Sequence, residues 1–411
     1  MLAALALLAT GCGRPASEEP GGWSPEQLSI LLRMALPTDP PASPSNRYAD
    51  HEGAAELGRA LFFDPGLSAD GSVSCASCHK PSLYFTDGQP TAVGLQAVER
   101  HTPTVLGATA YPFVGWDGHN DSLWSQALGP LEDPEEMGSH RLLVLRRIDV
   151  AHRAEYERVF GALPPLPDGL ESLQPESARE LWEELDPEVK SRVTDAFVNA
   201  GKSIEAYERR LHTGRAPFDE YVEALRSGDA EGGGHLTPAA VRGLEAFLGE
   251  ASCIHCHNGP FFTDLSFHNL GLPSSAKPPD TGRADGVARL LANEFRSDGP
   301  HADGTNPELA YIDSSFADAM GAFKTPSLRN VAVTAPYGHR GQFTTLEQLL
   351  DAYREDRPEP VVGHLDPLLT LVSPDFDVSD MKAFLESLTG APSRSDWWRA
   401  PLQTRRSVER D

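Results

Sequence analysis

The apolar residues of this chain recur mainly at helical spacing. Leu57, Ala60 and Leu61 share one face of a predicted helix, and Thr237 followed by Pro238 is a typical helix start. Strand patterns are few and short. The pattern therefore predicts a mainly α fold, with amphipathic helices within residues 49–64, 176–185, 193–214 and 237–249.

The rest of the sequence is rich in loop-forming residues and contains an internal repeat. The 35 prolines and 36 glycines indicate long ordered loops. The segments YFTD (84–87) and FFTD (261–264) each follow a pair of cysteines, and a glycine-rich stretch (226–238) lies between them. The two halves therefore resemble diverged copies of one unit.

Chain length and repeat together predict two domains. We expect an N-terminal domain over residues 23–232 and a C-terminal domain over residues 233–391. Residues 1–22 are expected to form an export signal and linker, and residues 392–411 a flexible tail.

Four of the five cysteines form two C-x-x-C-H motifs. In such a motif the two thiols bind a haem covalently and the histidine ligates its iron. A zinc site would need four ligands close together, whereas these pairs are far apart in the sequence. A redox dithiol would leave the histidines unexplained. The sequence therefore predicts two haem c groups, attached through Cys75, Cys78 and His79 and through Cys253, Cys256 and His257.

The first residues, MLAALALLATGC, resemble a short bacterial export signal, as c-type haem attachment outside the cytoplasm requires. The ending A-T-G-C is similar to a lipobox, in which Cys12 would carry a lipid anchor. The alternative is a cleaved signal with Cys12 removed or free. No other stretch is apolar and long enough to span a membrane. We therefore expect a periplasmic protein, which a lipid on Cys12 would tether to the membrane if the lipobox is used.

The formal net charge of -25 limits the classes of partner. Nucleic acid and anionic membrane surfaces would be repelled. A basic or locally positive electron donor would be attracted, although such a charge also serves solubility alone.

Six motifs in order resemble the bacterial di-haem cytochrome c peroxidase family, including its MauG-type branch, between about residues 50 and 390. They are LGRALFFDPGLSADGSVSCASCHKP, WDGHNDSLWSQALGPLEDPEEM, CIHCHNGPFFTD, FHNLGL, FKTPSLRNVAVTAPYGHRGQFTTLEQLLDAY and MKAFLESLTG. The resemblance implies two mostly helical, cytochrome-c-like domains with long ordered loops. It also implies that the N-terminal haem is the peroxide site and the C-terminal haem the electron-entry site.

The resemblance places Leu95 where many members carry a histidine that caps the N-terminal iron until the other haem is reduced. Leucine cannot ligate iron, so we expect a haem open to peroxide without reductive activation. His101, which stands where the family usually has asparagine, is a substitute ligand in one reading and a surface or supporting residue in the other.

The proton-transfer group implied by the resemblance is Glu136, with Gln126 as its hydrogen-bonding partner and Pro130 lining the pocket. A carboxyl in an apolar pocket has a raised pKa and can exchange protons near neutral pH. Without the resemblance, EDPEEM would indicate an acidic surface turn. Trp116 matches the family's tryptophan between the haems, an electron relay, and would otherwise be a core aromatic residue.

The resemblance also implies the outer ligand of the C-terminal haem. Tyr353 lies fourteen residues after His339, where the peroxidase branch has methionine and the MauG-type branch a ligating tyrosine. A phenolate would stabilise oxidised iron and lower the potential. Met381 lies on an apolar helix face, as a core residue would.

Family members also hold a calcium ion between the domains, partly through the stretch that contains Thr334 and Pro336. The asparagine that completes this site is replaced here by His101, and imidazole is a poor calcium ligand. Calcium is therefore a candidate cofactor only.

Two classes of function follow. The first is an enzyme that cleaves hydrogen peroxide at the N-terminal haem. Its electrons come from a small donor protein, a cytochrome c or cupredoxin, or from side chains of a protein substrate, as in MauG. The second class is a di-haem electron-transfer cytochrome without peroxide chemistry. Leu95 and Glu136 favour an enzyme, and Tyr353 favours MauG-like chemistry.

Overall fold

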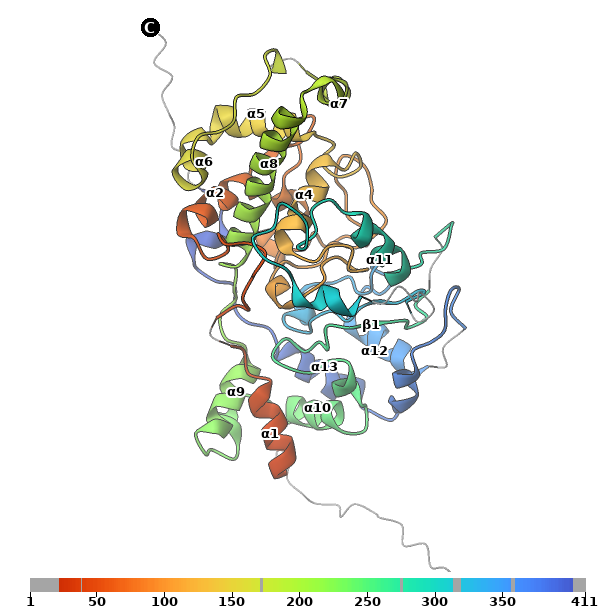
Figure 1. The fold of residues 1–411 in the computed structure, drawn as a ribbon. Helices are drawn as coiled ribbons and strands as arrows, with labels where there is room; N and C mark the ends of the chain where they lie inside the picture. The colour runs from red at the N-terminus through yellow and green to blue at the C-terminus, as the bar shows by residue number, and fades with distance from the viewer. Residues whose placement is uncertain are drawn as a thin grey trace, which may run out of the picture.

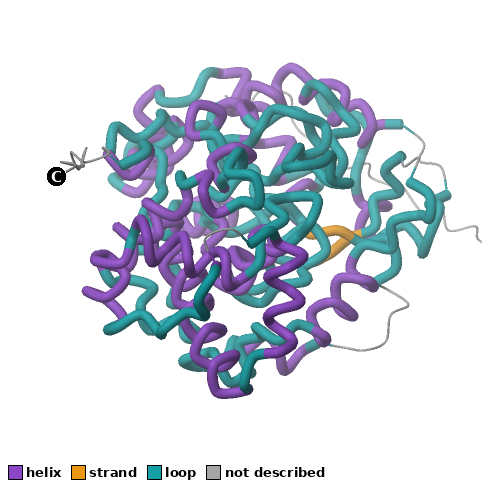
Figure 2. The backbone as a smooth tube through the Cα atoms, turned by 90° about the horizontal axis from the view of Figure 1, so that it is seen from above, coloured by secondary structure: helices purple, strands orange, loops and turns teal. Residues whose placement is uncertain are grey.

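The structure is a computed structural model that describes residues 22–37, 39–170, 173–273, 276–312, 319–355 and 359–401. Cys12 and the predicted export signal lie outside these residues. Within the described ranges the chain is mainly helical, and long loops surround one small antiparallel strand pair (Figures 1 and 2). The predicted fold class is therefore confirmed.

The helices are α1 (Pro25–Arg33), α2 (Glu52–Phe62), α3 (Cys75–Cys78), α4 (Leu123–Glu132), α5 (Arg141–Ala151), α6 (Arg153–Phe160), α7 (Pro175–Glu184), α8 (Pro187–Glu208), α9 (Pro217–Arg226), α10 (Pro238–Leu248), α11 (Arg283–Ala292), α12 (Leu346–Arg354) and α13 (Val378–Glu386). Strand β1 (Phe267–His268) pairs with β2 (Phe323–Lys324). Among the short 3-10 helices are η6 (Cys253–His255) and η10 (Asp396–Trp398).

A first hydrophobic cluster forms where α2 and α4 pack against α8, in the upper part of Figure 1. The buried face of α8 follows helical spacing and includes Val193, Phe197, Ala200 and Ile204. Gly58 of α2 lets the two helices cross closely, because a Cβ there would lie 1.8 Å from the carbonyl oxygen of Ser203.

A second cluster forms where α10 packs against α13. Gly243 likewise lets α10 and α13 cross closely, because a Cβ there would lie 2.0 Å from the carbonyl oxygen of Asp380. The predicted start of α10 is confirmed, because the Thr237 hydroxyl accepts a hydrogen bond from the Ala240 N–H and Pro238 opens the helix. Both halves thus use one design, a glycine at the crossing of two helices.

Helices α1 and α9 lie within the predicted N-terminal domain (23–232), but they pack on the second cluster, which the C-terminal half of the chain forms. Leu31 of α1, Met34 directly after it and Phe218 of α9 belong to the second cluster. In Figure 1 both helices lie in the lower part of the molecule, with α1 between α9 and α10. The apolar side chains of each amphipathic helix are covered there, and the limits of the two domains remain predictions.

Part of the segment 392–411, expected to be a flexible tail, packs on the first cluster. Trp398 of η10 is only 6% exposed, and its indole N–H donates a hydrogen bond to the carbonyl oxygen of His212 at 3.0 Å. Its ring also contacts the edge of Phe85. The buried indole anchors the chain as far as residue 401.

Buried ion pairs join residues from the two halves of the sequence. Asp117 lies 2.7 Å from Arg100 and 3.4 Å from Arg289 of α11. Arg100 also pairs with Asp280 at 2.9 Å. These contacts hold the loops around the space between the two clusters.

No helix in the described part of the chain is both long and apolar enough to cross a membrane.

Candidate functional site

A cavity of about 1220 Å³ extends between the two clusters and is lined by both C-x-x-C-H motifs. Five of the six predicted attachment residues line it, and the sixth, Cys75, packs against the first cluster. Most of the wall is apolar, as a macrocycle requires. The structure therefore brings together two attachment sites that are far apart in the sequence.

The two motif histidines are held in the same way. The Nδ1 atom of His79 lies 3.1 Å from the Phe85 carbonyl oxygen, and that of His257 lies 3.0 Å from the Phe262 carbonyl oxygen. Donation from Nδ1 leaves Nε2 as the free lone pair for iron. Burial lowers the pKa of both imidazoles, which favours the neutral, ligating form.

The repeated YFTD and FFTD segments form the turns that aim these carbonyl groups. Phe85 and Phe262 are fully buried and adopt left-handed backbone conformations, with φ of 59° and 54°. Such a conformation is uncommon for a bulky residue and marks a constrained turn. The sequence showed the repeat but not its function, which is to orient the histidines.

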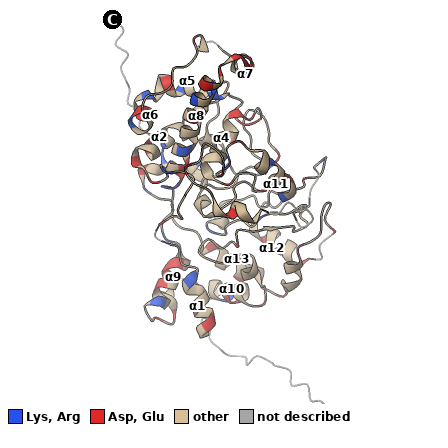
Figure 3. Ribbon diagram, viewed as in Figure 1, with Lys and Arg blue, Asp and Glu red and all other residues tan. Residues whose placement is uncertain are grey.

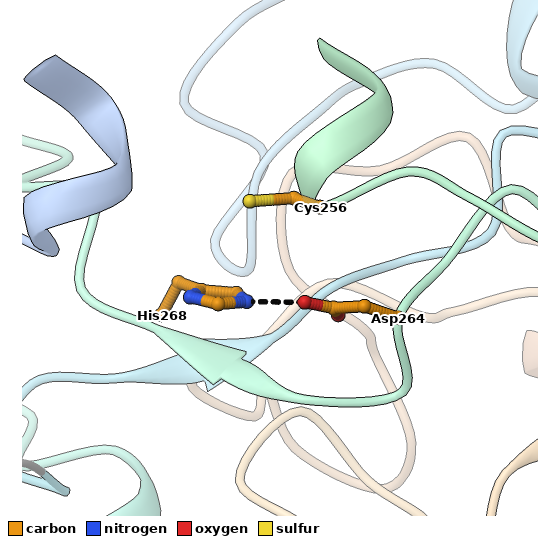
Figure 4. A group of neighbouring side chains, drawn as sticks. All are labelled: Cys256, Asp264 and His268. Carbon is orange, nitrogen blue, oxygen red and sulfur yellow. Dashed lines mark hydrogen bonds and ion pairs between the residues drawn. The ribbon is translucent and has the colours of Figure 1, made fainter. Parts of the chain in front are cut away.

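The described cysteines do not gather with other ligands as a four-ligand zinc site requires. Burial raises the pKa of the Cys75 and Cys253 thiols to about 12. Among the described residues, the side chains close enough to share a metal ion form one group of three, Cys256, Asp264 and His268 (Figure 4).

That group is an ion-pair clamp. The two ring nitrogens of His268 are each 2.7 Å from a carboxylate oxygen, one of Asp264 and one of Asp366. Burial alone would lower the pKa of His268, but its hydrogen bonds to Asp264, Cys256 and Asp366 raise it to about 11. An imidazolium with both nitrogens occupied cannot ligate a metal, so His268 ties the turn after the second motif to the loop that contains Asp366.

The wall of the first site contains the three residues predicted for peroxide chemistry. Gln126 and Pro130 lie one turn apart on α4, and Glu136 follows in the next loop. The Met137 N–H donates to the Pro130 carbonyl oxygen at 3.1 Å, which folds this loop back on the helix. The Gln126 and Glu136 side chains both line the cavity and make no hydrogen bond to each other. Burial, followed by the charges of Asp133 and Glu135, raises the pKa of Glu136 to about 7.

Leu95 is turned away from this cavity. Its backbone N–H donates to the Glu136 carbonyl oxygen at 2.8 Å, while its side chain packs on the first cluster beside Gly138. The neighbouring Gly94 lines the cavity instead. No side chain at position 95 therefore reaches the cavity.

His101 is buried between the two sites and fixed by hydrogen bonds. Its Nδ1 lies 2.8 Å from the Gln89 carbonyl oxygen, and its N–H donates to the His339 carbonyl oxygen. Its own carbonyl oxygen accepts the indole N–H of Trp116 at 2.8 Å. His101 thus orients Trp116, which lines the same cavity.

Two further residues of the cavity wall, Lys324 and Tyr111, received no function from the sequence. Lys324 donates its backbone N–H to the Trp116 carbonyl oxygen, and its ammonium group lies 3.7 Å from the centre of the Tyr111 ring. Burial lowers the pKa of Lys324 to about 7. Both side chains line the cavity. The only sequence signal was the position of Lys324 inside the FKTP motif.

The cavity wall also contains the predicted outer ligand of the second haem. Tyr353 of α12 lines the cavity. Met381 of α13 also lines it and is buried in the second cluster, as expected of a core residue. Thr334 and Pro336 lie on the same cavity wall, and calcium binding there remains a prediction.

Two equivalent histidine turns that face one apolar cavity define a di-haem protein of the c-type cytochrome class.

Comparisons with known proteins agree with this class. The sequence model of the di-haem cytochrome c peroxidase family matches residues 52–227. The methylamine utilization protein MauG of Methylorubrum extorquens is 33% identical over 391 residues, which cover 93% of this chain and 91% of that protein. Cytochrome c551 peroxidase of Nitrosomonas europaea is 30% identical over 342 residues, which cover 82% of this chain and 80% of that protein. A solved MauG-like protein associated with microbial copper homeostasis superimposes with a TM-score of 0.61 at 25% identity, covering 89% of this chain and 97% of that one.

The chain therefore belongs to the di-haem cytochrome c peroxidase and MauG family, as the sequence motifs predicted. This membership confirms the expected enzyme class, an oxidoreductase of the cytochrome c peroxidase type with two c-type haems.

Proposed function

We propose that this protein reduces hydrogen peroxide at the haem of the first motif, with electrons passed through the haem of the second. The observation that carries the proposal is one cavity lined by both motifs, with the carboxyl of Glu136 on the wall of the first site. The first haem would be held by Cys75, Cys78 and His79. The second would be held by Cys253, Cys256, His257 and Tyr353.

Reduction of one peroxide to two waters consumes two electrons and two protons. Bound haem iron supplies an open coordination position and the electrons. Because the pKa of Glu136 is about 7, its carboxyl can take a proton from one peroxide oxygen and return it to the other. The Gln126 amide offers a hydrogen bond within the same pocket, and Pro130 keeps that part of the wall apolar.

Trp116 is the proposed electron relay between the two haems. Its indole is oxidisable, lines the shared cavity and is held by the His101 carbonyl oxygen. A fixed ring orientation favours electron transfer because little rearrangement accompanies it.

The second candidate is a MauG-like enzyme that oxidises side chains of a protein substrate. Tyr353 on the wall of the second site favours it, since a phenolate ligand would stabilise oxidised iron there. A non-catalytic electron-transfer cytochrome is the third reading, and the buried carboxyl of Glu136 argues against it.

The partners and location follow from charge and cofactor chemistry. Acidic residues are spread over outer helices such as α7 and α9 (Figure 3), so we propose a small donor with a basic surface, a cytochrome c or cupredoxin. We further propose that the protein works in the periplasm, with a lipid anchor at Cys12 and a calcium ion near Thr334 and Pro336 as additional features.

An electron paramagnetic resonance spectrum of the resting ferric protein tests the open first haem. A high-spin signal with about one spin per protein is expected, beside a low-spin signal from the second haem. Two low-spin signals would contradict the proposal. Steady-state peroxide turnover with a reduced small cytochrome c, compared with oxidation of a candidate protein substrate, separates the first two candidates.

A further inference from the structure

The first site lies between two helix faces. Gln126, Gly129 and Pro130 of α4 line one side of the cavity. Asp285, Arg289 and Ala292 of α11 line the other, at spacings of four and three residues that place them on one helical face. Helices α4 and α11 therefore form two walls of the first site.

A second, smaller cavity of about 470 Å³ adjoins the first and opens to solvent between the same helices. The two cavities share four lining residues, Asn120, Gly129, Ala292 and Asn293. Gly129 and Ala292 are both exposed, so solvent reaches the shared wall at these two positions. A Cβ at Gly129 would meet no atom within 4 Å. The shared wall is therefore a place where solvent comes close to the first site.

The sides of this passage are polar and held in place. The Asn293 side-chain amide donates to Asn120 Oδ1 at 2.9 Å and to the Ser125 hydroxyl at 3.2 Å. Two carboxylates at the mouth, Glu132 and Glu294, are both paired with Arg141, at 2.8 and 2.9 Å. Arg141 offsets one of the two negative charges and links the end of α4 to the segment after α11.

We propose that hydrogen peroxide enters the first haem site between α4 and α11, past Gly129 and Ala292. The inference rests on the proposed function and adds to it the entry route and the size limit. Small residues on both walls leave the gap open, and the Asn120 and Asn293 side chains give it a polar side that suits a small uncharged hydroperoxide. The two positions act as a size filter and take no part in the chemistry.

The test uses two variants that narrow the gap, Gly129→Leu and Ala292→Leu, in the full haem-loaded protein. Leucine is a good helix former, and neither position is buried, so both variants should fold. Ala288→Leu is the matched control, because Ala288 is exposed on the same helix, one turn earlier, and lines neither cavity.

Cyanide is the probe, and its binding to the ferric protein is followed by stopped-flow absorbance. A narrower route changes rates but not the equilibrium. Both narrowing variants should therefore slow association and dissociation of cyanide equally, by about tenfold, and leave its dissociation constant unchanged. The reaction with hydrogen peroxide should slow by a similar factor, and Ala288→Leu should match the parent in every rate.

Three results would overturn these ideas in distinguishable ways. Unchanged rates in both narrowing variants would refute the route. An altered dissociation constant with an unchanged association rate would also refute it, by showing a disturbed pocket instead of a blocked entry. Absence of cyanide binding in the parent protein would refute the open first haem of the proposed function.

Discussion

Replacement of Glu136 by glutamine removes the proposed proton carrier with little change in shape. An ordinary glutamate, with a pKa near 4.5, is protonated to only about 0.3% at pH 7. With its pKa raised to about 7, Glu136 is about half protonated, so acid and base forms are both available at neutral pH. Glu136→Gln should lower the second-order rate constant for peroxide about a hundredfold, or about 2.7 kcal/mol of barrier.

The pH dependence of the parent protein supplies the second half of this prediction. The deprotonated carboxylate must accept the first proton from peroxide, and the raised pKa means that the group is protonated below pH 7. The rate constant should therefore fall as the pH drops below about 7 and level off above it. In Glu136→Gln this inflection should vanish. The assay is stopped-flow absorbance over pH 5 to 9, with haem content checked in each sample.

Glu135→Gln is the matched control, since Glu135 is exposed and adjacent and its charge helps to raise the pKa of Glu136. This variant should keep the parent rate within about twofold. Its inflection should move to lower pH, because loss of a neighbouring negative charge lowers the pKa. Parent-like kinetics in Glu136→Gln, or an inflection near pH 7 that persists in it, would refute the assigned function.

Three further predictions concern activation, ligation and packing. Because no side chain at Leu95 reaches the cavity, the fully oxidised protein should react with peroxide in a stopped-flow mix without prior reduction; activity only after one-electron reduction would point to His101 as a cap. Tyr353→Met should raise the potential of the second haem by roughly 100 mV or more in a redox titration, and an unchanged potential would exclude Tyr353 as ligand. Gly243→Ala should cost about 2 kcal/mol in chemical unfolding of the haem-loaded protein, because its Cβ would lie 2.0 Å from a carbonyl oxygen. In contrast, Gly129→Ala, with free space around it, should stabilise its helix by about 0.5–1 kcal/mol.

Local features of this protein could be predicted from the sequence, because short-range chemistry determines them. The haem motifs and the Thr237–Pro238 helix start need only neighbouring residues. The sequence did not predict that α1, near the N-terminus, packs on the second cluster, or that Trp398, near the C-terminus, packs on the first. These contacts depend on which apolar surface the rest of the fold leaves uncovered. The crossing glycines, Gly58 and Gly243, escaped notice for the same reason: their necessity arises from a helix distant in sequence.

In the candidate site, too, the sequence identified residues but did not predict the properties that distant parts of the chain give them. The resemblance located Glu136, but its pKa of about 7 follows from burial and from the turn that places Asp133 and Glu135 beside it. The contact of Lys324 with the ring of Tyr111 joins residues that no local pattern connects. Properties that depend on the surroundings of a residue, such as this pKa and this contact, could therefore be derived only from the structure.

The two halves share the histidine turn but differ in the other residues proposed to serve each haem, which is how one repeated unit could serve the two proposed functions. The histidine side is nearly the same in both, with Nδ1 held by the carbonyl oxygen of Phe85 in one and of Phe262 in the other. The cavity wall also contains Glu136, the proposed proton carrier of the first haem, and Tyr353, the proposed outer ligand of the second. Because the repeated turn orients each histidine independently of these residues, we expect that substitutions in the loop after α4 or on α12 change the reactivity of one haem and leave the attachment of both intact.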